Sequence, residues 1–241
     1  MQQDLSWLVE RPIAHRGWHG AGRGCENSLP AFHAAVQAGF AIELDVQMSK
    51  DGEAMVFHDT TLSRLTDRNG PVDALDANAL RDLALPADSG TIPTLWEVHE
   101  AVGQTPLVIE VKGDGRDPER LTERVVELVR RMDGPRAVMS FSHDVLAVCE
   151  RSGLPFGLTA EGRNERSLAR HRSIADRAAF LSYHVEDLPN PFVERFRETG
   201  RPVITWTVRT REQIVRSHEW ADQLTFEGFD PRERTGRTPA A

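Results

Sequence analysis

The chain has 241 residues, a formal net charge of −8 and a hydrophobic share of 39%. This length suits one large domain and lies in the range of eight-stranded α/β barrels. The net negative charge argues against general affinity for nucleic acid or anionic membranes, since binding to either requires a basic protein surface. The N-terminal residues lack a basic stretch followed by an apolar run, and no window has the length of a membrane span.

The two cysteines, Cys25 and Cys149, suggest neither a disulfide framework nor a thiolate metal site. Together with the charge and the N-terminal sequence, this predicts a cytoplasmic protein with no stable membrane anchoring. We expect its partner to be a small molecule, and the sequence leaves the oligomeric state open.

The first elements are a short apolar segment, a helix and a strand. Residues 11–15 end in a histidine, and a glycine-rich loop follows. Asn27 and Ser28 predict the start of a helix, because both residue types are favoured at the N-cap. Gly39 ends this helix, since glycine readily adopts the left-handed conformation of a C-terminal cap. A strand over residues 40–48 begins at once.

This strand has two distinct faces. Successive side chains of a strand point to opposite sides, so its apolar residues share one face and its polar residues the other. Such alternation is also typical of a strand with one face in water, and the pattern alone does not separate a solvated face from a functional one. The wholly apolar face comprises Phe40, Ile42, Leu44, Val46 and Met48; the opposite face, which carries two carboxylates, comprises Ala41, Glu43, Asp45 and Gln47.

A second short strand is expected at residues 54–58, after a turn. Residues 62–92 contain clusters of Asp, Asn, Gly and Pro with little periodicity, which predicts a short loop-rich insertion. Thr94 then predicts the start of a helix, and residues 107–112 form the next strand.

Beyond this strand, helices and strands alternate regularly. The alternation implies parallel strands joined by right-handed crossovers, and about eight principal strands favour a closed barrel. A doubly wound sheet is the competing fold, but no G-x-G-x-x-G motif follows the first strand. We therefore predict an α/β protein, a single-domain (β/α)8 TIM barrel over residues 1–230, with a disordered tail at 231–241. The further helices are predicted at 118–132, 143–152, 165–172, 191–199 and 210–218, and the further strands at 136–140, 155–159, 178–182, 202–208 and 222–226.

Three acidic side chains are expected to meet at one end of this barrel. Functional groups of such folds lie at the carboxyl ends of the strands, where Glu43, Asp45 and Glu110 would all point into the mouth. Because buried carboxylates repel one another, they must either take up protons or share a cation. Carboxylates without histidine or thiolate partners are typical ligands of a hard divalent ion, Mg²⁺ or Ca²⁺.

Short motifs follow one another along residues 11–228, and it is their order that is specific, since each one is common by chance. They are His15-Arg16-Gly17, Glu26-Asn27-Ser28, Glu43-Leu44-Asp45-Val46, Lys50-Asp51-Gly52, His58-Asp59, Ile92-Pro93-Thr94-Leu95, Glu110-Val111-Lys112, Ser140-Phe141-Ser142 and Trp206-Thr207-Val208. In order and approximate spacing this set resembles the glycerophosphodiester phosphodiesterase family. Two places depart from the family pattern: Ser28 stands where Thr is usual, and Phe226 and Glu227 stand where the last strand usually ends in Thr-Asp.

The resemblance implies that Glu43, Asp45 and Glu110 bind a divalent cation, and that His15 and His58 perform acid–base catalysis. Imidazole suits proton transfer because its pKa lies near the working pH. The resemblance also implies small phosphodiesters as substrates.

Further residues are candidates for substrate binding. Arg16 offers a forked donor and Lys112 a point charge for the phosphate, although Lys112 could instead form a structural pair with Glu110. Glu26 is either a substrate ligand or a charge that the helix dipole favours at the helix entry. Trp206 either lines the glycerol pocket or belongs to the core.

The expected function is metal-dependent hydrolysis of glycerophosphodiesters to sn-glycerol 3-phosphate and an alcohol. Either water or the neighbouring glycerol hydroxyl could attack, and the second route passes through a cyclic phosphate. One alternative is a lysophospholipase D-type activity, which needs an apolar cleft beside the mouth, whereas the insertion has only scattered leucines. A non-catalytic metabolite-binding barrel is the other alternative; a degenerate copy should have lost a histidine or a metal carboxylate, and this chain keeps them all.

Overall fold

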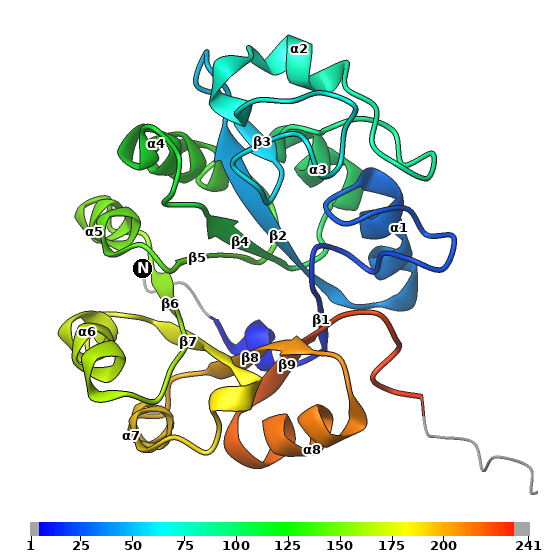
Figure 1. The fold of residues 1–241 in the computed structure, drawn as a ribbon. Helices are drawn as coiled ribbons and strands as arrows, with labels where there is room; N and C mark the ends of the chain where they lie inside the picture. The colour runs from blue at the N-terminus through cyan, green and yellow to red at the C-terminus, as the bar shows by residue number, and fades with distance from the viewer. Residues whose placement is uncertain (1–4, 234–241) are drawn as a thin grey trace, which may run out of the picture.

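Eight parallel strands close into a barrel with helices around it (Figure 1), in a computed structural model that describes residues 5–233. The strand order around the barrel is β1-β2-β4-β5-β6-β7-β8-β9, and β9 pairs with β1 to close it. The strands are β1 (Ile13–Ala14), β2 (Ala41–Met48), β3 (Ala54–Val56), β4 (Leu107–Val111), β5 (Arg136–Ser140), β6 (Phe156–Ala160), β7 (Phe180–His184), β8 (Val203–Val208) and β9 (Gln223–Phe226). Among the strands of residues 5–233, β3 alone pairs in an antiparallel way, forming a hairpin with β2. The predicted (β/α)8 TIM barrel is confirmed.

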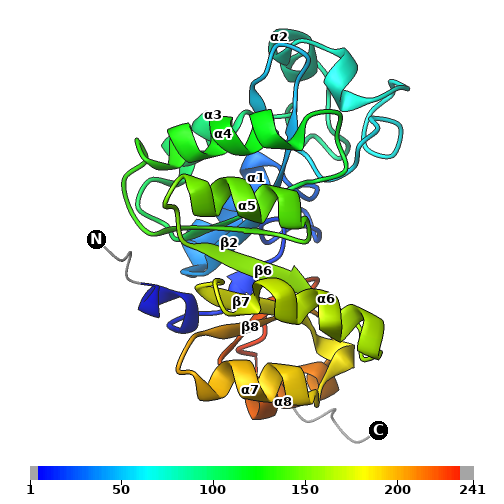
Figure 2. The same ribbon diagram turned by 90° about the vertical axis from the view of Figure 1, so that its left-hand side faces the viewer.

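The helices form the outer layer, and Figure 2 shows α4, α5, α6 and α7 following one another along the outside of the barrel. They are α1 (Leu29–Ala38), α2 (Ala77–Arg81), α3 (Leu95–Val102), α4 (Pro118–Val129), α5 (His143–Arg151), α6 (Glu165–Ala175), α7 (Pro191–Glu198) and α8 (Arg211–Trp220). Polar N-cap side chains fix where most of them begin: Ser28 accepts a hydrogen bond from the Ala31 amide, and Thr94 forms a capping box with Glu97. None of the helices within residues 5–233 combines the length and the apolar character needed to cross a bilayer.

Two apolar layers hold the barrel together. The outer layer lies between strands and helices and includes the whole predicted apolar face of the strand at 40–48, which packs against helix residues such as Phe32 and Leu95. A smaller cluster, with Phe180 and Ile204, fills the inside of the barrel, and the 3₁₀ turn Ser6–Val9 adds Trp7 and Leu8 to it. Both faces of β2 are therefore out of water, so its polar face belongs to the barrel interior.

The insertion at residues 62–92 is more ordered than its sequence indicates. It contains α2 and the 3₁₀ turn Val72–Ala74, and lies over the β2–β3 hairpin, with α2 at the outer edge in Figure 1. Its apolar side chains turn inward and form a cluster of their own with Met55 and Phe57. The insertion is thus a small packed cap with an apolar interior.

The unusual last strand still closes the barrel: β9 pairs with β1 on one side and, with a register shift between Thr205 and Val208, with β8 on the other. The amide of His15 donates a hydrogen bond to the carbonyl of Phe226 (2.9 Å). The Phe226 side chain is fully buried, with its ring centroid 4.7 Å from that of Phe40. Arg232 lies over the Phe40 ring and donates to the carbonyl of Ala38, which ties residues just past the barrel to α1. Of the predicted disordered tail, residues 234–241 lie outside the described residues.

The surroundings of Gly157 leave no room for a side chain inside the barrel. A Cβ atom added to Gly157 of β6 would lie 2.2 Å from the Phe180 ring. Because the ring is enclosed, Gly157→Ala is expected to lower the free energy of unfolding by about 1–3 kcal/mol, the usual cost of overpacking. Chemical denaturation measures the change. Gly115→Ala is the control, because its added Cβ would meet nothing closer than 3.5 Å; equal stabilities of both variants would contradict the prediction.

Candidate active site

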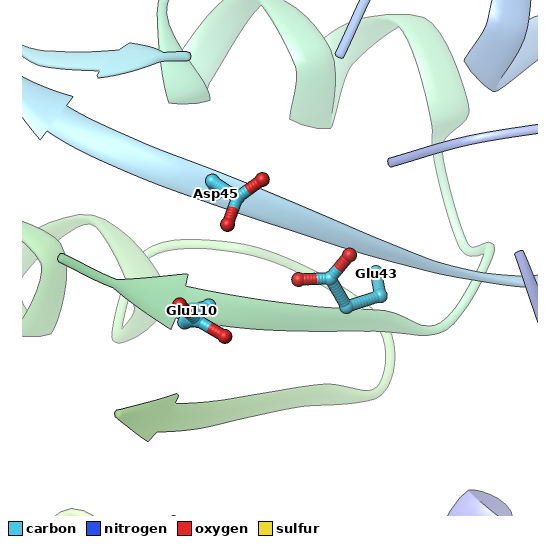
Figure 3. A group of neighbouring side chains, drawn as sticks. All are labelled: Glu43, Asp45 and Glu110. Carbon is cyan, nitrogen blue, oxygen red and sulfur yellow. The ribbon is translucent and has the colours of Figure 1, made fainter. Parts of the chain in front are cut away.

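Three carboxylates from two neighbouring strands point toward one another (Figure 3). Glu43 and Asp45 come from β2 and Glu110 from β4, and parallel pairing sets Asp45 directly beside Glu110. Each offers an oxygen atom within 4.8 Å of the others, and all three side chains are buried. The predicted convergence of these three residues is therefore what the barrel produces.

Two permanent cations face this cluster. The ammonium of Lys112 lies 2.7 Å from Glu110 Oε1 and 3.1 Å from Asp45 Oδ1, and Arg16 Nε lies 3.1 Å from Asp45 Oδ2. Burial alone would raise the pKa of Asp45, but Lys112 and Arg16 hold it well below its usual value. Both predictions for Lys112 are compatible with this geometry, because it pairs with Glu110 and also lines the cavity described below.

Glu43 is the least compensated member of the cluster. Its only hydrogen-bond donor among the described residues is the backbone amide of Arg16, at 3.0 Å. Burial, together with repulsion from Asp45 and Glu110, raises the pKa of Glu43 well above its usual value. The three carboxylates face only two permanent cations within this cluster, so negative charge is left to be balanced. A hard divalent cation, which prefers oxygen ligands, would balance it.

The sequence did not indicate how Asp45 is oriented. Asn27, expected only at a helix start, is buried and adopts a left-handed backbone conformation (φ 54°). Its side-chain amide donates to Asp45 Oδ2 at 2.9 Å, and its side-chain oxygen accepts from the Asp45 backbone amide at 3.3 Å. Asparagine tolerates this conformation better than most residues, so Asn27 can both shape the loop and hold the carboxylate.

His15 lies directly after β1, with 9% of its surface exposed. Its Nδ1 atom is 2.8 Å from Glu227 Oε2, and its Nε2 atom is 3.9 Å from Glu43 Oε2. Burial lowers the pKa of His15 and outweighs the opposing hydrogen bond with Glu227. His15 is thus a buried imidazole with a carboxylate on each side.

His58 follows β3 and is more exposed than His15. Its Nδ1 atom is 2.7 Å from Asp59 Oδ1, and Arg64 of the insertion donates to the same carboxylate through Nε (2.6 Å). The bonds from Arg64 and His58 lower the pKa of Asp59 to about 2. Arg64 also donates two hydrogen bonds of 2.8 Å to Glu26, so the insertion is joined to the loop after β1.

These groups surround one cavity of about 190 Å³. Its lining includes most of the predicted site residues: His15, Arg16, Glu43, Asp45, His58, Glu110, Lys112 and Trp206. Glu26 is not part of the lining and instead pairs with Arg16 (2.8 Å) and Arg64. Its contacts are those of a residue that orients the arginines.

Aromatic rings form another part of the cavity lining. Trp206 of β8 contacts Phe141 (ring centroids 5.3 Å apart) and His184 (4.9 Å), and all three line the cavity. Phe141 is 39% exposed, which is unusual for a large apolar side chain. From the sequence, Phe141 has no role of its own, whereas the position of His184 just after a predicted strand indicates that it could reach the rim of the site.

A larger cavity, of about 710 Å³, lies at the opposite end of the barrel. It is lined by residues that precede or open β8 and β9, among them Pro202, Asp222 and Gln223. None of the three carboxylates or the two site histidines lines it, so size alone does not identify the reactive end. The smaller cavity holds the groups that can bind a cation, bind an anion and transfer protons.

The sequence of this chain is similar to those of known proteins. A family model described as the glycerophosphoryl diester phosphodiesterase family matches residues 15–228. A glycerophosphodiester phosphodiesterase of Caldanaerobacter subterraneus subsp. tengcongensis is 29% identical over 218 residues, covering 85% of this chain and 88% of that protein. A human lysophospholipase D is 30% identical over 171 residues. This match covers 64% of this chain and 53% of the human protein.

Among solved structures, a phosphodiesterase of Oleispira antarctica in complex with the product sn-glycerol-3-phosphate has a TM-score of 0.79 and 25% sequence identity. The match covers 92% of this chain and 94% of the other.

Proposed function

Because the chain belongs to the glycerophosphoryl diester phosphodiesterase family, we propose that it hydrolyses glycerophosphodiesters to sn-glycerol 3-phosphate and an alcohol. The observation that carries this proposal is the set of groups around one cavity: two histidines, three carboxylates, Arg16 and Lys112. A phosphodiester is anionic and its alkoxide leaving group is poor, so its hydrolysis needs both positive charge and proton transfer.

We assign Glu43, Asp45 and Glu110 as the residues that would hold a divalent cation, Mg²⁺ or Ca²⁺. When bound, such an ion would supply positive charge against the negative charge that develops on the phosphoryl oxygens. Arg16 and Lys112 line the same cavity and would add fixed positive donors for the phosphate.

His15 and His58 are the proposed proton-transfer groups. One removes a proton from the attacking oxygen atom, which belongs either to water or to the adjacent glycerol hydroxyl. The other delivers a proton to the alcohol oxygen as its bond to phosphorus breaks. When the glycerol hydroxyl attacks, a cyclic phosphate forms, and water then opens it to give sn-glycerol 3-phosphate. Each ring has Nδ1 engaged by a carboxylate, so each has Nε2 available for these transfers.

The shape of the site favours small glycerophosphodiesters over lysophospholipids. An acyl chain would need exposed apolar surface beside the mouth, but the apolar side chains of the insertion are largely buried in their own cluster. Among the described residues at the cavity, Phe141 is the one large apolar side chain that is exposed. The non-catalytic alternative is disfavoured because every proposed acid, base and ligand faces the cavity or its carboxylate cluster.

The test is turnover of glycerophosphocholine, glycerophosphoethanolamine and lysophosphatidylcholine with Mg²⁺, Ca²⁺ or EDTA. We expect release of sn-glycerol 3-phosphate from the first two substrates, loss of activity in EDTA, and recovery when the metal is returned. Activity that survives chelation would refute the metal assignment. Preferred cleavage of the lysophospholipid would support the lysophospholipase D alternative, and binding without turnover of any of the three would support the non-catalytic barrel.

A further inference from the structure

Glu227 is the carboxylate that contacts His15 at Nδ1. It stands directly after β9, at one of the two positions where the chain departs from the family pattern. Its Oε2 atom lies 2.8 Å from His15 Nδ1 and also accepts a hydrogen bond of 2.8 Å from Arg209, the residue after β8. Three adjacent strand ends thus supply a histidine, a carboxylate and an arginine in contact with one another.

The backbone around Glu227 is fixed on both sides. The Glu227 amide donates to the carbonyl of Val208 (3.0 Å), and the His15 amide donates to the carbonyl of Phe226 (2.9 Å). Since both residues are anchored through the barrel strands, the relative position of ring and carboxylate is set by the fold. Groups supported in this way hold reactive geometry better than groups on free loops.

The contact determines where the ring proton lies. An ionised carboxylate only accepts hydrogen bonds, so the nitrogen that faces Glu227 must carry a hydrogen. The bond to His15, with Arg209 nearby, lowers the pKa of Glu227 to about 2, and the carboxylate is therefore ionised at neutral pH. In the neutral ring the hydrogen then sits on Nδ1, and Nε2 is left as an acceptor on the side of Glu43.

We propose that Glu227 is a positioning residue that holds His15 in the Nδ1–H tautomer, so that Nε2 is the atom exchanging protons with substrate. This inference rests on the proposed function, in which His15 is a proton-transfer group. Arg209 supports the carboxylate, although its guanidinium is mostly exposed and the pair contributes little energy by itself.

His58 provides an internal parallel. Its Nδ1 atom also faces a carboxylate, that of Asp59 at 2.7 Å, and that carboxylate also accepts hydrogen bonds from an arginine, Arg64. The two assemblies come from different parts of the chain: Asp59 adjoins its histidine in sequence, whereas Glu227 lies 212 positions from His15. The same arrangement has thus arisen at both proposed proton-transfer groups.

The kinetic test uses Glu227→Ala, Glu227→Gln and the control Glu219→Ala, which removes an exposed carboxylate of α8. Loss of an outer partner of a functional histidine typically costs 10–100-fold, so we expect Glu227→Ala to lower kcat by about that factor, with KM changed less than threefold. Glu227→Gln should retain more activity, because the amide oxygen can still accept from Nδ1–H. Glu219→Ala should match the unaltered protein.

A merely structural role is separated by a double-mutant cycle and by spectroscopy. If Glu227 acts through His15, Glu227→Ala should cost less than about threefold in a His15→Ala background. ¹⁵N NMR of the histidine rings should show His15 protonated at Nδ1 in the unaltered protein and shifted toward Nε2–H in Glu227→Ala. An unchanged tautomer in Glu227→Ala, or equal losses in both backgrounds, would overturn the inference. Full activity in His15→Ala would instead refute the proposed role of His15, while the NMR result would still decide what Glu227 does.

Discussion

Replacing either His15 or His58 with alanine is expected to lower kcat by about 10²–10⁴-fold, the usual contribution of a positioned acid or base. Both rings line the cavity that holds the three carboxylates, and each has Nδ1 occupied by its own carboxylate partner. KM should change much less, because phosphate binding is assigned to Arg16 and Lys112. Steady-state kinetics on the substrate that turns over best measures both parameters.

His33→Ala and His218→Ala are matched controls for this measurement. Both histidines are exposed on outer helices, α1 and α8, and lie outside the cavity lining. Their variants should retain normal kcat, and circular dichroism should show all four variants folded. Full activity of His15→Ala or His58→Ala would remove that residue from the proposed mechanism.

The second large effect is expected at Glu43, where activity and stability should move in opposite directions. Glu43→Gln keeps the shape of the side chain but removes a buried charge that Asp45 and Glu110 repel. The metal-free variant should therefore be at least as stable toward denaturant as the unaltered protein. Its kcat should fall by about 10²–10³-fold, comparable to the loss of one electrostatic contributor to a transition state.

Thermal unfolding with and without Mg²⁺ or Ca²⁺ completes this test. A ligand that binds only the folded state raises the unfolding temperature, and this rise should be lost or strongly reduced in Glu43→Gln. Glu123→Gln removes an exposed carboxylate of α4 and should leave kcat and the metal-induced rise unchanged. A metal-induced rise of full size in Glu43→Gln would show that Glu43 is not a ligand.

The barrel could be predicted because its sequence carries two independent periodicities. The alternation of strands and helices after residue 112 specifies parallel strands, and the period of two at residues 40–48 specifies which face of β2 turns inward. The strand predicted at 136–140 coincides with β5. The insertion was harder to interpret: α2 has only five residues, too short to show a helical pattern, and its order comes from tertiary packing with Met55 and Phe57.

Within the site, residues carried by strand ends could be predicted, and their supporting partners could not. Glu43, Asp45 and Glu110 follow from alternation along two strands, whereas Asn27 resembles an ordinary helix start until its left-handed backbone is seen. The pairing of Glu227 with His15 depends on which strand closes the barrel beside β1. The local sequence does not indicate which distant segments lie side by side in the fold. This pairing could therefore be recognised only once the structure placed β9 next to β1.

The closure of the barrel by β1 and β9 also sets when the site can exist. His15 is synthesised before β2 and β4, but its backbone amide donates to the carbonyl of Phe226 in β9, the last strand of the barrel. Before β9 has emerged from the ribosome, the growing chain can contain the three carboxylates of β2 and β4, but the position of His15 is not yet fixed. Contacts of such long sequence separation form late and slowly. Newly made chains should acquire activity only after β9 has been synthesised and has paired with β1.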